Sequence, residues 1–169
     1  MSISFQSLAR SGKGKGKGKS SSNDLEYTFD VWASGDQEFP GAVVTETTAV
    51  AELTIDKFMR YIDFDLDVSN GVGITAAHLH CGKAGTFGGV VVALASTPVG
   101  VTVDGHYEAG RITNADISDP GCGLTIPIDS VVTLVDAMVR GDIYFNVHSL
   151  ANPPGEVRGQ VFLGIEELH

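Results

Sequence analysis

Two stretches of the 169-residue sequence carry histidines at a spacing that suits a metal ion. His78 and His80 are separated by one residue, and side chains two apart in a strand project to the same face. Neutral imidazole nitrogens are ligands for zinc and copper, and such a pair needs at least one further ligand. His148 is the best candidate, because alternation along residues 142–148 places it opposite the apolar face of that strand. We therefore predict a copper or zinc site formed by His78, His80 and His148.

The same histidines have a plainer interpretation, in which they hydrogen-bond to backbone and carboxylate groups and hold loops together. A single His-x-His pair is a weak motif. Its position favours a site, because both histidine clusters end a strand at a glycine-rich loop. His106 is a further candidate ligand, but it follows Asp104-Gly105 in a predicted turn, which is typical of a surface residue.

The sequence contains two cysteines, Cys81 and Cys122, each followed by glycine. A disulfide between them is the simplest use, and closing that loop would stabilise the fold by about 4 kcal/mol in an oxidising compartment. In the alternative, Cys81 is a soft ligand for copper(I) or zinc beside His80. Adjacent residues of a strand point to opposite faces, which favours the disulfide.

Two other groups of charged residues are expected to have structural roles. Glu156 and Arg158 share a face after the Pro153-Pro154-Gly155 turn, and we expect an exposed pair that positions the preceding loop and contributes under about 1 kcal/mol. Three aspartates alternate with apolar residues between positions 63 and 67, which predicts a solvated strand face. Calcium bridging is the alternative for them, although the glycine of a calcium loop is missing.

Charge is distributed unevenly along the chain. Five of the 11 basic residues lie before residue 23, and all 21 acidic residues follow it. Residues 23–169 therefore carry 6 basic and 21 acidic side chains, a net charge of −15. Such a body repels nucleic acid, and only residues 1–22 have the charge to bind an acidic polymer. The alternation of lysine and glycine in residues 1–22 predicts a solvated tail or linker.

Residues 23–169 are predicted to form one all-β domain. Frequent glycine turns separate short stretches that are β-branched or alternate with a period of two. The expected strands are 25–33, 43–55, 58–68, 74–81, 90–95, 106–112, 143–148 and 157–163, with a turn at 69–73. One short helix is expected near 130–140, capped by Asp129 or Ser130 and ended by Gly141. This pattern predicts an antiparallel Greek-key β-sandwich or barrel.

Several strings of the sequence, taken in order, resemble the chordin-type (CHRD) domain. They are GDQEFP at 35–40, AHLHCGKAG at 77–85 with GGVVVAL at 88–94, GDIYFNVH at 141–148 and NPPGEVRGQ at 152–160. The resemblance spans about residues 25–163. Phe87 and Ser149 stand where the family usually has asparagine and threonine.

The resemblance implies an extracytoplasmic β-sandwich or barrel that occurs alone in microbial proteins and repeated in chordin, where it is associated with binding secreted signalling proteins. It implies no settled enzymatic activity. The histidine strings are also similar, more loosely, to those of copper/zinc superoxide dismutase, a Greek-key barrel whose copper site includes a His-x-His pair. This sequence has no obvious bridging histidine flanked by zinc ligands.

Two functions are therefore expected. The first is a non-catalytic extracellular or periplasmic module that binds a protein or matrix partner and holds a metal ion through His78, His80 and His148. The second is a copper-dependent redox enzyme built on the same histidines. No run of 18 or more apolar residues is present, so we expect no membrane span. The first 25 residues lack the apolar segment of a secretory signal, so any export signal is expected to lie outside this sequence.

Overall fold

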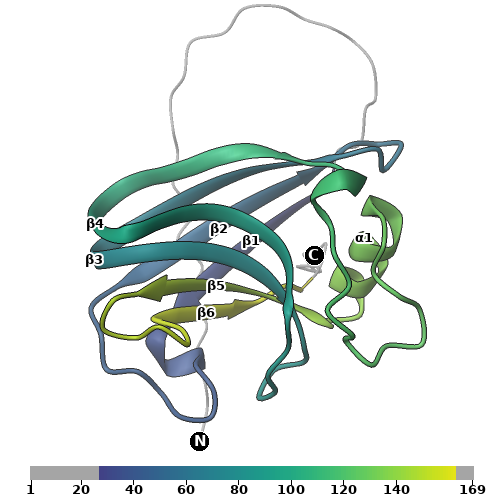
Figure 1. Cartoon of the computed structure of the whole chain (residues 1–169). Coiled ribbons are helices and arrows are strands. Elements are labelled where there is room, and N and C mark those ends of the chain that lie inside the picture. The colour runs from purple at the N-terminus through teal and green to yellow at the C-terminus, as the bar shows by residue number, and fades with distance from the viewer. Residues whose placement is uncertain (1–26, 163–169) are drawn as a thin grey trace, which may run out of the picture.

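The computed structural model describes residues 27–162 as an antiparallel β-barrel. The strands are β1 (Tyr27–Ser34), β2 (Thr48–Ile55), β3 (Ile62–Cys81), β4 (Val90–Ile112), β5 (Ile143–Ser149) and β6 (Val157–Gln160). They follow the order β2-β1-β6-β5-β3-β4, and a further β2–β3 pairing closes five strands into a barrel with β4 added along β3 (Figure 1). The predicted all-β class is confirmed. The lysine-rich tail, residues 1–22, lies outside the described residues.

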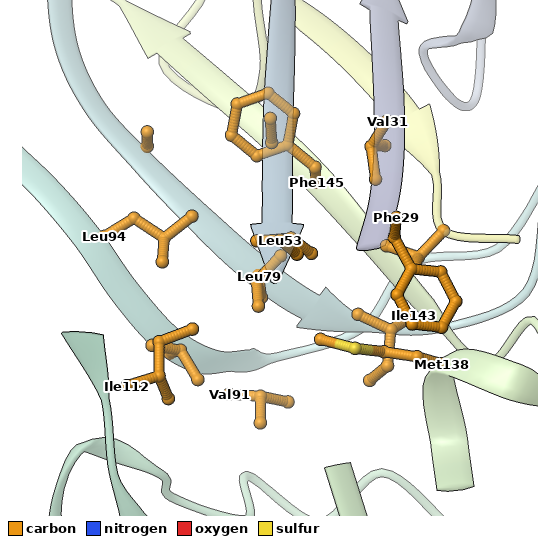
Figure 2. Packing of buried hydrophobic residues seen from close by; sticks show 14 of the residues in the cluster. Phe29, Val31, Leu53, Leu79, Val91, Leu94, Ile112, Met138, Ile143 and Phe145 are labelled. Carbon is orange, nitrogen blue, oxygen red and sulfur yellow. The ribbon is translucent and has the colours of Figure 1, made fainter. Parts of the chain in front are cut away.

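The barrel interior is apolar because alternate residues of each strand point inward. Phe29 and Val31 of β1, Leu79 of β3 and Phe145 of β5 are each at most 2 % exposed. Figure 2 shows these side chains gathered between the strands, with Met138 contributed by the helix. Burial of this one cluster fixes which face of β3 and β5 points outward.

The predicted helix is present as α1 (Val131–Val139). Ser130 begins it, because its hydroxyl accepts a hydrogen bond from the Thr133 amide, and Gly141 follows its end with a φ of 70°. In Figure 1 the helix lies at one end of the barrel. Two short 3-10 helices, η1 (Gly35–Gln37) and η2 (Asn114–Asp116), complete the elements. Within residues 27–162, no helix has the length and apolar character needed to cross a membrane.

The structure corrects two strand boundaries. The turn predicted at 69–73 is wrong, because Asn70 and Gly73 take positive φ values of 55° and 64° and shift the register without ending β3. The strands predicted at 90–95 and 106–112 are likewise one long strand, β4, paired along β3. One bent strand can therefore pair with β2 through its first half and with β5 through its second half.

Candidate metal centre

Three histidines meet on the outer face of β3 and β5. The antiparallel register pairs His78 with Asn146, His80 with Tyr144, and Ala76 with His148. Leu79 and Val147 take the opposite, inward direction into the barrel core. The same alternation therefore brings both predicted histidine clusters to one face.

The ring nitrogens of these histidines converge. His78 Nδ1 lies 3.0 Å from His148 Nε2, and His80 Nε2 lies 3.4 Å from the same atom. All three ligand atoms lie within 4.8 Å of one another. His106 is not part of this group; it is exposed on β4, with its Nδ1 3.2 Å from a carboxylate oxygen of Asp65.

Two of the rings are fixed by backbone carbonyls. His80 Nδ1 lies 3.1 Å from the carbonyl oxygen of Gly88, and His148 Nδ1 lies 3.0 Å from that of Pro153. A carbonyl oxygen only accepts, so each Nδ1 carries the proton and each Nε2 presents a lone pair. The two lone pairs face each other across 3.4 Å with no proton between them. This carbonyl–imidazole arrangement is the usual outer support of a metal-ligating histidine.

The site favours neutral imidazoles. Burial lowers the pKa of His78 to about 4, and repulsion from His148 and His80 adds to this effect. Burial also lowers the pKa of His80 to about 4, although its hydrogen bond to Gly88 opposes the shift. The pKa of His148 is lowered as well, again chiefly by burial. At neutral pH the three rings are therefore uncharged, which is the form that binds a transition metal.

Arg158 holds the loop that carries the Gly88 carbonyl. Its Nη1 and Nη2 donate to the carbonyl oxygens of Thr86 and Lys83 at 2.8 and 2.9 Å. The loop approaches β3 so closely that a Cβ at Gly88 would lie 1.3 Å from the carbonyl oxygen of Cys81. Only glycine fits there, and the carbonyl that anchors His80 is thereby fixed beside the ring.

Glu156 holds the loop that carries the Pro153 carbonyl. Its carboxylate accepts hydrogen bonds from the Ser149 hydroxyl at 2.7 Å and the Asn152 amide at 2.6 Å, and a third from Thr45. The segment between β5 and β6 is therefore tied at both ends to one carboxylate. The anchor of His148 depends on that segment in the same way that the anchor of His80 depends on Arg158.

These contacts correct the expected Glu156–Arg158 pair. The two side chains were expected to be exposed and paired, but they are 6 % and 2 % exposed. No ion pair joins them in the described part of the chain, and each binds a different loop. The reason is that loops cover the outer face of β5 and β6, so that all seven residues of β5 are buried.

Cys81 and Cys122 are bonded to each other, and their Cα atoms are 5.8 Å apart. The bond joins the end of β3 to the segment that precedes α1. Cys81 belongs to the buried core, on the face of β3 opposite His80. The alternative in which Cys81 is a metal ligand beside His80 is therefore wrong.

Sequence reasoning gave no role to several neighbours of the histidines. Tyr144 stacks on His80, with ring centroids 4.9 Å apart and planes 9° apart. Asn146 donates to Glu38 at 2.6 Å, and burial raises the pKa of that carboxyl. Alternation along β5 placed Tyr144 and Asn146 on the histidine face, but nothing in the spacing indicated that Glu38 would reach it.

A comparison with protein-family models matches the CHRD domain to residues 29–161. The chain belongs to the CHRD domain family. The matched part of this CHRD domain runs from β1 to the residue after β6 and contains the three histidines, both cysteines, Glu156 and Arg158. No curated protein and no solved structure gave a significant match.

Proposed function

We propose that this CHRD domain is an extracytoplasmic binding module that holds a copper or zinc ion through His78, His80 and His148. The observation that carries the proposal is the convergence of three neutral ring nitrogens, two of them fixed by carbonyls so that their lone pairs face each other. A cation between the rings would relieve that repulsion, whereas no proton is available to bridge His80 and His148.

The donor set supports a transition metal of the copper or zinc type. All three atoms are imidazole nitrogens, which copper and zinc accept readily, and none is a hard oxygen of the kind that calcium and magnesium prefer. The ligands stand on two paired strands rather than on free loops. A site on rigid elements keeps its geometry when the ion leaves, and this favours reversible binding.

Two features support a location outside the cytoplasm. The Cys81–Cys122 disulfide persists only where thiols are not kept reduced. The CHRD family is the second support, since its members are extracellular-type modules. A protein or matrix partner for the module, and an acidic polymer for residues 1–22, stay predictions from the sequence.

The metal proposal is tested by titrating tag-free protein with copper(II) and with zinc(II) after treatment with a chelator, using calorimetry. We expect one ion per chain for the wild type and loss of that ion in His80→Ala and His148→Ala. His106→Ala is the matched control, because His106 is an exposed histidine outside the cluster. Binding that survives unchanged in both His80→Ala and His148→Ala would refute the proposed site.

A copper redox enzyme is the second candidate, and the partial exposure of His78 favours it. His80 and His148 are 8 % exposed, whereas His78 is only half-buried. Three protein ligands leave a coordination position for a small molecule that reaches the ion from this side. Superoxide turnover by copper-loaded protein, abolished in His80→Ala, would support the enzyme; metal binding without turnover would support the module.

A further inference from the structure

A pocket separate from the histidine cluster opens between the loop after β3 and the segment that contains Cys122. Its volume is about 270 Å³. The Cys81–Cys122 disulfide, Leu124 and Phe87 are among its lining residues, and Asp142 and Lys83 supply its charged groups. This size is near the lower end of the range for ligand pockets, so it suits a small molecule or a single side chain rather than a large cofactor.

The carboxylate of Asp142 is buried at this pocket and incompletely partnered. Its side chain is 7 % exposed. Within residues 27–162, no donor lies within hydrogen-bond distance of Asp142 Oδ1. Lys83 Nζ comes to 3.9 Å from that atom, and Arg140 Nε lies 3.5 Å from Oδ2. A buried carboxylate oxygen without a donor is costly, so a donor that enters the pocket would be favoured.

An ammonium group already lies near Asp142 at this pocket, that of Lys83. Its ammonium already faces Asp142, but too far away for a hydrogen bond, and its side chain is 74 % exposed. Displacing such a side chain costs little, because it is mostly solvated. An ammonium that displaces Lys83 would take its place beside Asp142, while its aliphatic stem would lie against the disulfide and Leu124.

We propose that this pocket binds a primary ammonium group carried on a short aliphatic stem, with Asp142 as its counter-ion. The source of this chemistry is either a free alkylamine or a lysine side chain of another protein. The proposal does not rest on the metal proposal, because none of the three histidines lines the pocket, although both sites share the loop that carries Gly88.

The test is a titration of the full, disulfide-bonded chain with Nα-acetyl-lysine amide, followed by NMR chemical shifts. Nα-acetyl-norleucine amide, which lacks the ammonium, is the neutral control. We expect saturable binding of the lysine probe and binding weaker by about tenfold or more in Asp142→Asn, since a charge-assisted hydrogen bond is lost. The backbone bonds of residue 142 to Gly82 and Ala137 do not involve the side chain, so the variant is expected to fold.

Two further variants sharpen the test. Lys83→Met removes the competing ammonium from an exposed position and keeps the backbone carbonyl that Arg158 uses, so binding should tighten severalfold. Glu108→Gln removes one negative charge from an exposed position on β4, outside the pocket lining, and should leave binding unchanged. Equal binding of the lysine and norleucine probes would overturn the proposal, as would unchanged affinity in both Asp142→Asn and Lys83→Met.

A second titration with n-butylammonium distinguishes the two sources. A free-amine pocket should bind n-butylammonium as tightly as the lysine probe. A pocket for a protein side chain should bind the lysine probe more tightly, because the amide groups of that probe would form hydrogen bonds with the backbone of the glycines that line the pocket. Either result supports the pocket, and failure of both ligands to bind would refute it whatever the outcome of the metal titration.

Discussion

The guanidinium carbon of Arg158 lies 3.6 Å from the centroid of the Tyr144 ring. The Tyr144 ring in turn stacks on His80. Arg158 thus reaches the proposed metal ligand by two routes. One is the stack through Tyr144, and the other is the loop whose Gly88 carbonyl accepts from His80. Both routes fix the direction in which the His80 ring presents its Nε2.

Arg158→Met should therefore weaken metal binding although it removes no ligand. Loss of an outer partner of a metal-ligating histidine lowers affinity by about ten- to a hundredfold. Competition with a chromophoric chelator measures the change, with circular dichroism to verify the fold. Arg111→Met is the matched control, because Arg111 also lies 3.6 Å from a tyrosine centroid, that of Tyr61, but away from the histidines. A comparable loss of affinity in both variants would contradict a role for Arg158 at the site.

Glu156→Gln should destabilise the protein at neutral pH by about 1 to 3 kcal/mol, the usual cost of losing charge-assisted hydrogen bonds to a buried group. Burial alone would raise the pKa of Glu156, but hydrogen bonds from Thr45, Asn152 and Ser149 outweigh it, and the pKa is lowered. A carboxyl with a lower pKa in the folded state contributes stability above its unfolded pKa, about 4.3. That contribution disappears as the pH falls through the folded pKa.

The difference in unfolding free energy between wild type and Glu156→Gln should consequently be largest near pH 7 and shrink below about pH 4.3. Urea unfolding at a series of pH values measures it. Glu108→Gln, which changes an exposed carboxylate on β4, should show little difference at any pH. A gap between wild type and Glu156→Gln that stays constant down to the lowest pH would be inconsistent with an ionised, hydrogen-bonded Glu156.

The shared face of His78, His80 and His148 was predictable because it depends only on the period of two within each strand. Their contact also required β3 and β5 to be neighbours, and this comes from a register that local sequence does not specify. The burial of Glu156 and Arg158 was missed for a related reason. Their burial depends on loops from distant parts of the chain. The alternation of residues in a strand predicts which side chains share a face, but it does not predict which loops cover that face.

The continuity of β3 also could not be predicted from local sequence. Asn70 and Gly73 are typical turn residues, and they do take positive φ values. In this barrel they bend a strand rather than end it, because β4 remains paired to β3 on both sides of the bend. Tertiary pairing therefore decided between a turn and a bulge that the same residues permit.

Removing the disulfide should lower stability without changing the metal ligands. The bond spans a sequence separation of 41 residues, and a loop of that length corresponds to about 4 kcal/mol in the chain-entropy model. The double variant Cys81→Ser/Cys122→Ser should therefore unfold at lower urea concentration than the oxidised wild type. Reductant should bring the wild type to the level of the variant and leave the variant unchanged. Sensitivity of the variant to reductant would show that another process is being measured.

Metal binding should raise the thermal stability of the protein through the three histidines. An ion that binds only the folded state adds about 2.7 kcal/mol when its free concentration is a hundred times Kd. For a domain of this size, that corresponds to a rise in Tm of about 5 to 10 °C. Scanning calorimetry with zinc(II), before and after addition of a chelator, measures the rise and its reversal. His106→Ala should keep the full shift, whereas His148→Ala should lose it even if its own Tm differs from that of the wild type. A shift of equal size in His148→Ala would place the ion elsewhere, with the exposed Asp65, Asp67 and His106 group as the alternative to examine.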